Sequence, residues 1–353
     1  MPTTRRRFLQ MMALAAGSSY IGTGCADALD MSVRDDAWRP AYAELEDAGL
    51  LAARIEEAYA KLENCDLCPH ACGVNRLRGE KGFCEAMDQA VVHSHGPHYG
   101  EELPLVGRGG SGTIFFSHCN LRCVFCQNWP IAHLGHGRTV DDAQLAEMML
   151  DLQRRGCHNI NLVTPTHFLP NILGAVRIAS SQGLRLPLCY NTGGYDSVES
   201  VRLLDGVVDI YLPDLKFMGR EESSMYAIKG RGDYPETAKA AILEMHRQVG
   251  DTKVFGESVA RRGLMIRHLV MPNEVAGTRE FVEWVAAELP LDTYVNIMSQ
   301  YRVEHMAFDY AAIARAITSR EYVEAMDWAL AAGLTNLDVR SLANLEIHRR
   351  MLG

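Results

Sequence analysis

The feature that most constrains the fold of this chain is a regular alternation of short apolar runs with helical segments between residues 113 and 298. Short apolar runs bounded by turn residues are typical of buried parallel strands. Six such runs cover residues 113–117, 159–163, 186–190, 207–212, 264–270 and 294–298. Helical periodicity lies between them, over residues 141–155, 169–181, 197–204, 234–249 and 278–288. Six βα units in series predict an α/β fold with a parallel sheet, either a partial barrel or an open doubly wound sheet.

The flanks of this region predict helices and a cysteine-rich module. Helical spacing of Leu, Ala and Glu predicts one long helix over residues 41–64, and residues 91–104 form a linking segment. The C-terminal part predicts a helical cap with main helices over 308–317 and 320–331. We therefore predict four parts, which are a signal-like segment (1–28), a helix with a cysteine-rich module (29–105), a barrel (106–300) and a C-terminal cap (301–353).

Polar residues follow almost every predicted strand. In parallel α/β folds the functional site lies at the C-terminal ends of the strands, so these residues are the first candidates for chemistry. Asp214 and Lys216 follow an apolar run at once, which favours a role in a site over the alternative of a surface ion pair. Among the histidines we single out His167, because it stands at a strand end beside Thr166.

Three cysteines, Cys119, Cys123 and Cys126, follow the first predicted strand in a C-x₃-C-x₂-C pattern. A cubane iron–sulfur cluster needs four thiolate ligands. The nearest other cysteines, Cys84 and Cys157, lie more than 30 residues away in the sequence. The pattern predicts a [4Fe–4S] cluster with one open iron, which can chelate the amino and carboxylate groups of a small ligand and pass it an electron. A zinc or structural thiol site is the alternative.

A second group of four cysteines precedes the predicted barrel. Its spacing is C-x₂-C-P-x₂-C-x₁₁-C, with glycines for tight turns, and it consists of Cys65, Cys68, Cys72 and Cys84. Four thiolates fit tetrahedral zinc and an iron–sulfur cluster equally well. A second iron–sulfur cluster, a structural zinc ion and unmetallated thiols therefore stay open. Cys157 and Cys189 border apolar runs and are expected to be small buried side chains.

The first cysteine motif, with the aromatic Phe125 before its last cysteine, resembles the signature of the radical S-adenosylmethionine (radical SAM) superfamily. The flanking residues 112–123 and 127–129 resemble a narrower group of bacterial proteins related to the pyruvate formate-lyase activating enzyme. Further similar segments extend the resemblance from Cys65 to about Tyr301, and they cover 161–167, 209–216, 266–272 and 296–301. The resemblance implies a partial parallel (β/α)₆ barrel with an N-terminal cysteine-rich module and C-terminal helices.

The resemblance also implies the cofactors and their ligands. Cys119, Cys123 and Cys126 would ligate the [4Fe–4S] cluster, and Phe125 would pack beside the adenine of S-adenosylmethionine (SAM). Candidates by position for binding the rest of SAM are the strand-end residues Thr164, Thr166, Asn191, Asp214, Lys216, Arg267 and Gln300. The chain departs from the family where Thr164-Pro165-Thr166 stands in place of Gly-Gly-Glu and Asn191 in place of an aspartate. These departures leave the binding of SAM's amino group open.

The activity implied by the family is reductive cleavage of SAM to a 5′-deoxyadenosyl radical that abstracts hydrogen from a substrate. The narrower resemblance implies an activase that acts on a backbone glycine of a partner protein and a low-potential electron donor of the flavodoxin or ferredoxin type. Radical modification of another peptide or a small metabolite is an alternative. An iron–sulfur electron carrier is another, but a carrier would not need the polar residues at the strand ends.

Charge and the N-terminus bear on partners and location. The net charge is −9 and no cluster of Lys or Arg follows Arg7, so we expect no nucleic-acid partner. Residues 4–10 resemble a twin-arginine export signal, and a weakly apolar run over 11–24 follows it, although an ordinary amphipathic helix is an alternative. Export conflicts with the cytoplasmic supply of SAM and low-potential electrons, so the location stays open.

Overall fold

Six parallel strands form the centre of the computed structural model, which describes residues 38–255 and 259–353. Each strand pairs in parallel with the next in the order β2 (Ser111–Phe116), β4 (Ile160–Val163), β5 (Leu188–Thr192), β6 (Ile210–Pro213), β8 (Val259–Leu269) and β9 (Tyr294–Met298). These strands match the six predicted runs. Along the far edge of β9 the described residues form only an isolated bridge, between Val295 and Leu337. The barrel is therefore partial, and the predicted α/β fold is confirmed.

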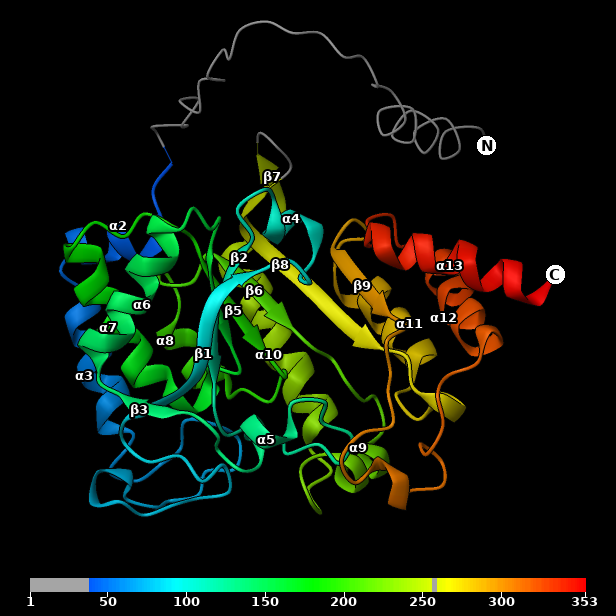
Figure 1. Ribbon diagram of the computed structural model, residues 1–353, viewed down its shortest axis with the longest axis horizontal. Helices are drawn as coiled ribbons and strands as arrows, with labels where there is room; N and C mark the ends of the chain where they lie inside the picture. Colours follow the sequence, from blue (N-terminus) through cyan, green and yellow to red (C-terminus); the bar gives the residue numbers. More distant parts are fainter. Residues whose placement is uncertain (1–37, 256–258) are drawn as a thin grey trace, which may run out of the picture. The chain divides into compact units, whose positions relative to one another are not determined.

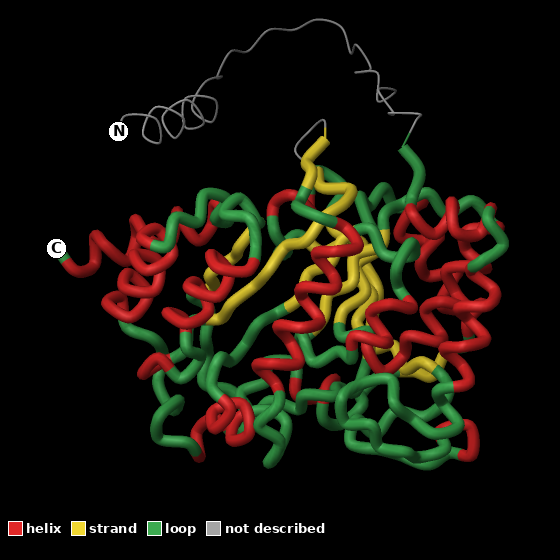
Figure 2. The backbone as a smooth tube through the Cα atoms, turned by 180° about the vertical axis from the view of Figure 1, so that it is seen from behind, coloured by secondary structure: helices red, strands yellow, loops and turns green. Residues whose placement is uncertain are grey.

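Helices connect the strands and cover the outside of the curved sheet (Figure 1). They are α6 (Asp142–Arg154), α7 (Leu169–Ser181), α8 (Val198–Leu203), α10 (Tyr234–Val249) and α11 (Thr278–Glu288). A capping box between Asp141 and Gln144 begins α6, and it satisfies backbone N–H groups that the helix leaves free. The view from behind shows the central helix, α10, lying across the strands (Figure 2). Every residue of β5 and β6 is buried, as expected for strands covered on both faces.

The segment that we expected to be a linker, residues 91–104, is part of the sheet, so that prediction was wrong. It contains β1 (Ala90–His98), which pairs antiparallel with β2 and with β3 (Arg138–Val140), and the start of α4 (Leu103–Val106). Only the short β3 lies on the outer side of β1, and most residues of β1 are exposed or half-buried, so the strand needs few apolar residues. The polar composition of β1 therefore concealed the strand.

The single helix predicted over residues 41–64 is two helices, α2 (Ala41–Asp47) and α3 (Leu51–Ala60). Gly49 separates them with a φ of 71°, a left-handed conformation that ends a helix and that favours glycine. The start of α2 is fixed by the buried Asp209, which accepts hydrogen bonds from the backbone N–H groups of Ala41 (2.9 Å) and Leu188 (3.0 Å).

The helix predicted over residues 308–317 was also wrong. This segment is a short 3₁₀ turn (Ala307–Asp309) followed by turns and bends. Two of its backbone carbonyls accept hydrogen bonds from side chains instead of from a helix. The Tyr301 hydroxyl donates to Ile313 O at 2.7 Å, and the Asn273 amide donates to Ala312 O at 2.7 Å. The second predicted helix is confirmed as α12 (Ser319–Ala331), and the last helix, α13 (Val339–Leu352), was not predicted.

Short elements complete the described part of the chain. They are α5 (Trp129–Ala132), α9 (Arg220–Tyr226), β7 (Lys253–Phe255) and 3₁₀ turns at Arg76–Arg78, Thr166–Phe168 and Pro272–Glu274. In the described residues no helix is both long and apolar enough to cross a membrane. The signal-like segment 1–28 lies outside the described residues, so the twin-arginine motif stays a prediction.

Candidate active site

The three motif cysteines lie together on the loop that follows β2. Cys123 is buried, and Cys119 and Cys126 are half-buried. Burial and the neighbouring Cys119 raise the pKa of the Cys126 thiol to about 12. Burial likewise raises the pKa of Cys123, against which the nearby Lys216 acts. These thiols would ionise only when a metal centre supplies positive charge, and metal binding displaces such protons.

The conformation of this loop is fixed by polar contacts from several parts of the chain. The Leu121 N–H donates to the Cys119 sulfur (3.3 Å), and the Asn120 amide donates to the backbone carbonyl of Tyr195 (2.6 Å). His118 and Arg122, on either side of these residues, have φ values of 70° and 51°. Such strain in residues other than glycine is typical of functional sites.

The donor set fits the predicted cluster. Thiolates are the protein ligands of iron–sulfur clusters, and Cys119, Cys123 and Cys126 follow one another on a single loop. Three thiols on one loop would therefore hold three irons of a [4Fe–4S] cluster and leave the fourth open.

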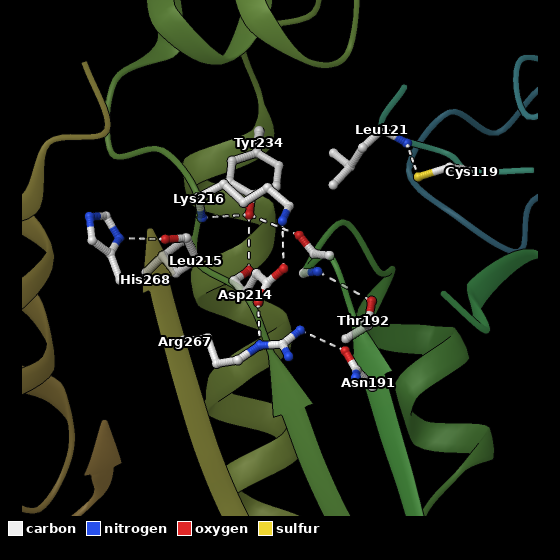
Figure 3. Close-up of polar contacts among 12 residues, drawn as sticks. Cys119, Leu121, Asn191, Thr192, Asp214, Leu215, Lys216, Tyr234, Arg267 and His268 are labelled. Atoms are coloured by element: carbon white, nitrogen blue, oxygen red, sulfur yellow. Dashed lines mark hydrogen bonds and ion pairs between the residues drawn. The ribbon is translucent and has the colours of Figure 1, made fainter. Parts of the chain in front are cut away.

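A charged network at the strand ends lies beside this loop (Figure 3). Asp214 follows β6 and accepts hydrogen bonds from Lys216 Nζ (2.5 Å) and Arg267 Nε (2.6 Å). A second nitrogen of Arg267, Nη2, donates to Asn191 Oδ1 at 2.7 Å. The sequence predicted all four residues as members of the site, and the fold brings them together from three strands.

The network is charged although it is buried. Burial alone would raise the pKa of Asp214, but Arg267 and Lys216 hold it below its ordinary value. Burial would lower the pKa of Lys216, but Asp214 raises it. The site therefore offers both a carboxylate and two cations at neutral pH, which matches a ligand with an ammonium and a carboxylate group.

The turn after β5 can approach this network only because it lacks a side chain. Gly194 has a φ of 84°, and a Cβ placed there would lie 2.3 Å from the backbone oxygen of Asp214. The hydroxyl of Tyr234 accepts a hydrogen bond from Lys216 N (2.9 Å) and lies 3.0 Å from the same oxygen. Glycine and tyrosine together thus hold the backbone on which Asp214 and Lys216 stand.

The other predicted binding residues lie around the network: the Thr164 N–H donates to Asn191 O at 2.9 Å, and Gln300 lines a cavity together with Arg267. The Thr166 hydroxyl donates to Asp196 Oδ1 (2.7 Å), a fully buried carboxylate that the sequence analysis missed. Thr164 ends β4 with a φ of 59°. Phe125 is buried and packs against Phe217, with 5.9 Å between ring centroids, and against Tyr301, with 6.0 Å. Gln300 is exposed, and its backbone oxygen accepts from Gln127 Nε2 at 3.2 Å. Their roles toward SAM stay predictions.

A polar cavity of about 250 Å³ adjoins Arg267. Its lining includes Glu101, Glu102, Asn296, Gln300, Arg340, Ser341 and Asn344. Arg267 Nη1 lies 3.5 Å from Glu101 Oε2, and Asn296 donates to Glu102 Oε1 at 2.8 Å. The other oxygen of Glu102 is buried, and no group in the described part of the chain forms a hydrogen bond with it. Sequence reasoning missed both glutamates because they lie in the segment expected to be a linker.

Burial of the glutamates and histidines in this region makes the protein sensitive to pH. Burial, opposed by Arg267, raises the pKa of Glu101 to about 7. The buried imidazole of His268 lies against Leu215 O at 2.6 Å and Thr278 Oγ1 at 2.9 Å, and burial lowers its pKa to about 4.

His268 is expected to make the protein less stable in acid. In the unfolded chain His268 binds a proton below its ordinary pKa of 6.5. In the folded chain it stays neutral until the pH falls to about 4. From about pH 7 to about pH 4 the His268 contribution should fall by about 2 to 3 kcal/mol. In urea unfolding, the difference in unfolding free energy between wild type and His268→Gln should become smaller as the pH falls across this range. The exposed His93→Gln is the control, and an unchanged difference would contradict the assignment.

This chain is similar to several known proteins. The family model described as the Radical SAM superfamily matches residues 113–285. An uncharacterized protein of Methanocaldococcus jannaschii is 33% identical over 290 residues, which cover 79% of this chain and 78% of that protein. Native anSMEcpe with bound AdoMet is 14% identical with a TM-score of 0.39, covering 61% of this chain and 57% of that one. Methylornithine synthase (PylB) has the same identity and TM-score, with coverages of 64% and 69%. This chain thus spans little more than half of the first of these structures. By its family model and its cysteine loop, the chain belongs to the radical SAM superfamily.

Proposed function

We propose that this radical SAM enzyme is an activase that acts on a backbone glycine of a partner protein. The observation that carries the proposal is the polar cavity beside Arg267, because that arginine belongs both to the cavity and to the strand-end network. A substrate in the cavity would therefore adjoin the predicted SAM site. The proposal also rests on the resemblance of the cysteine loop to the activating enzymes.

Some residues of the chain would hold the cluster, and others would bind and orient SAM. Cys119, Cys123 and Cys126 would hold the cluster, which when bound supplies the electron that cleaves SAM and so starts hydrogen abstraction. Asp214 would pair with the ammonium group of SAM's methionine part, and Arg267 or Lys216 with its carboxylate. A low-potential donor of the flavodoxin or ferredoxin type would supply the electron.

The lining of the cavity suits a peptide backbone. Side-chain amides of Asn296, Gln300 and Asn344 and the hydroxyl of Ser341 both donate and accept hydrogen bonds, as peptide groups do. A second candidate function, modification of a small metabolite, is favoured by the volume of the cavity. About 250 Å³ is slightly below the range of pockets for drug-sized ligands.

The experiment that tests the proposal separates the two substrate classes. Reduced enzyme and SAM are incubated with either the protein fraction or the small-molecule fraction of the source cells. We expect 5′-deoxyadenosine and a long-lived carbon-centred doublet in electron paramagnetic resonance (EPR) only with the protein fraction. Enzyme without the three motif cysteines is the control and should give neither. If only the small-molecule fraction promotes 5′-deoxyadenosine formation, the activase assignment fails.

A further inference from the structure

The cysteine-rich module encloses a second candidate metal site, separate from the loop after β2. One cavity is lined by all four of its cysteines, together with His70, Arg76 and His167. Cys65, Cys68 and Cys84 are buried and Cys72 is half-buried. Two of these lining residues, a buried arginine and a buried histidine, indicate what the cavity holds.

The arginine is Arg76, which is 1% exposed. Its Nε donates to the backbone oxygen of Met87 at 3.0 Å, and its Nη1 lies 4.0 Å from the sulfur of Cys65. No carboxylate in the described part of the chain forms an ion pair with it. A buried cation without a counter-charge is costly, by several kcal/mol. Thiolates in the cavity would supply that counter-charge, whereas neutral thiols would not.

The histidine is His167, which is also 1% exposed and reaches the cavity from the turn between β4 and α7. Its Nε2 lies 2.8 Å from the backbone oxygen of Ser117. A carbonyl oxygen only accepts, so Nε2 carries the proton and Nδ1 of the neutral ring keeps a lone pair. This Nδ1 is buried and has no hydrogen-bond partner among the described residues. A metal centre in the cavity would therefore lie against a polar nitrogen that the rest of the described chain leaves without a partner.

The surroundings of the sulfurs, rather than their number, favour a cluster over a zinc ion. Four thiolates alone suit either metal centre. The backbone N–H of Phe83 also donates to the sulfur of Cys72 at 3.4 Å, a type of contact that tunes iron–sulfur clusters.

We infer that Cys65, Cys68, Cys72 and Cys84 hold a second iron–sulfur cluster, with Arg76 as its counter-charge. The module contacts the first cluster loop, because His70 Nε2 lies 2.8 Å from Asn120 O, and His167, which lines the same cavity, lies 2.8 Å from Ser117 O on the other side of Cys119. The inference concerns cofactor content alone and does not depend on the substrate proposed above.

The test counts metals, so it does not require SAM cleavage. Full-length protein is purified without oxygen, reconstituted with iron and sulfide, and assayed for iron, sulfide and zinc. We expect about eight irons per chain in the wild type and about four after Cys68→Ala with Cys84→Ala. The matched control, Cys157→Ala, removes a buried cysteine outside both groups and should keep about eight.

A second variant keeps the test decisive if the module mutant does not fold. The triple change of Cys119, Cys123 and Cys126 to alanine leaves the module intact, and it should retain about four irons with matching sulfide. Its dithionite-reduced form should still give the EPR signal of an iron–sulfur cluster. One zinc per chain in that variant, or no metal at all, would overturn the inference.

Discussion

Replacing Cys119, Cys123 and Cys126 together by alanine is expected to remove about four irons per chain and all reductive cleavage of SAM. The three thiols are the protein ligands that the loop after β2 offers to the predicted cluster, so their loss leaves that cluster without protein ligands. The measurements are iron content and the yield of 5′-deoxyadenosine with dithionite as reductant. The effect should be a complete loss of activity rather than a weaker binding of SAM.

Two controls accompany this variant. Cys157→Ala, which changes a buried cysteine of the core, should keep both iron and activity. The far-ultraviolet circular dichroism of the triple variant should match that of the wild type, because the fold around the loop is held by contacts such as the one from Asn120 to Tyr195. Release of 5′-deoxyadenosine by the triple variant would refute the assignment of the cluster.

Local sequence signals were sufficient for the central elements of the fold. The bounds predicted for α7, α10 and α11 are those observed. These helices begin beside a proline or after a left-handed glycine, as Pro170, Pro235 and Gly277 illustrate. The strands between them are apolar throughout because both of their faces are covered, so their runs stand out in the sequence.

Elements that depend on distant partners could not be predicted. The backbone carbonyls of residues 312 and 313 accept hydrogen bonds from the side chains of Asn273 and Tyr301. These bonds replace helical ones, and nothing in the local sequence indicates them. Helix α13 has a weak apolar face, and its start is fixed by Asp338, which accepts from the N–H groups of Arg340 (2.7 Å) and Ser341 (3.3 Å). That aspartate was a signal that could have located the helix.

The candidate site also contains residues that could be predicted from the sequence and residues that could not. Asn191, Asp214, Lys216 and Arg267 were predictable because the ends of parallel strands meet at one edge of a sheet. Glu101 was not, because it reaches Arg267 from a loop 166 positions earlier in the sequence. The contribution of such a loop depends on how the chain before the barrel returns to it, which strand periodicity does not encode.

Arg267→Met is expected to cause the largest loss of stability among single changes in the site, about 3 to 5 kcal/mol of unfolding free energy. The side chain of Arg267 is 16% exposed and contacts the buried carboxylates Asp214 and Glu101 at 2.6 and 3.5 Å. Methionine fills a similar volume but leaves both acids without this cation. The pKa of Asp214 should then rise, because burial would no longer be opposed by Arg267. Urea unfolding of wild type and variant is the measurement.

The pH dependence of that loss separates the charge effect from a packing effect. An acid with a raised pKa in the folded state destabilises it once the unfolded chain has ionised, so the deficit of Arg267→Met should be larger at about pH 8 than at about pH 5. Arg267→Lys retains the positive charge and should lose less unfolding free energy than Arg267→Met. Arg279→Met removes an exposed arginine paired with Glu283 at 3.0 Å, and it should change stability by less than about 0.5 kcal/mol. A deficit of Arg267→Met that is equal at both pH values would mean that packing, and not the ion pairs, accounts for the loss, and the charged network would then have no role in holding the strand ends together.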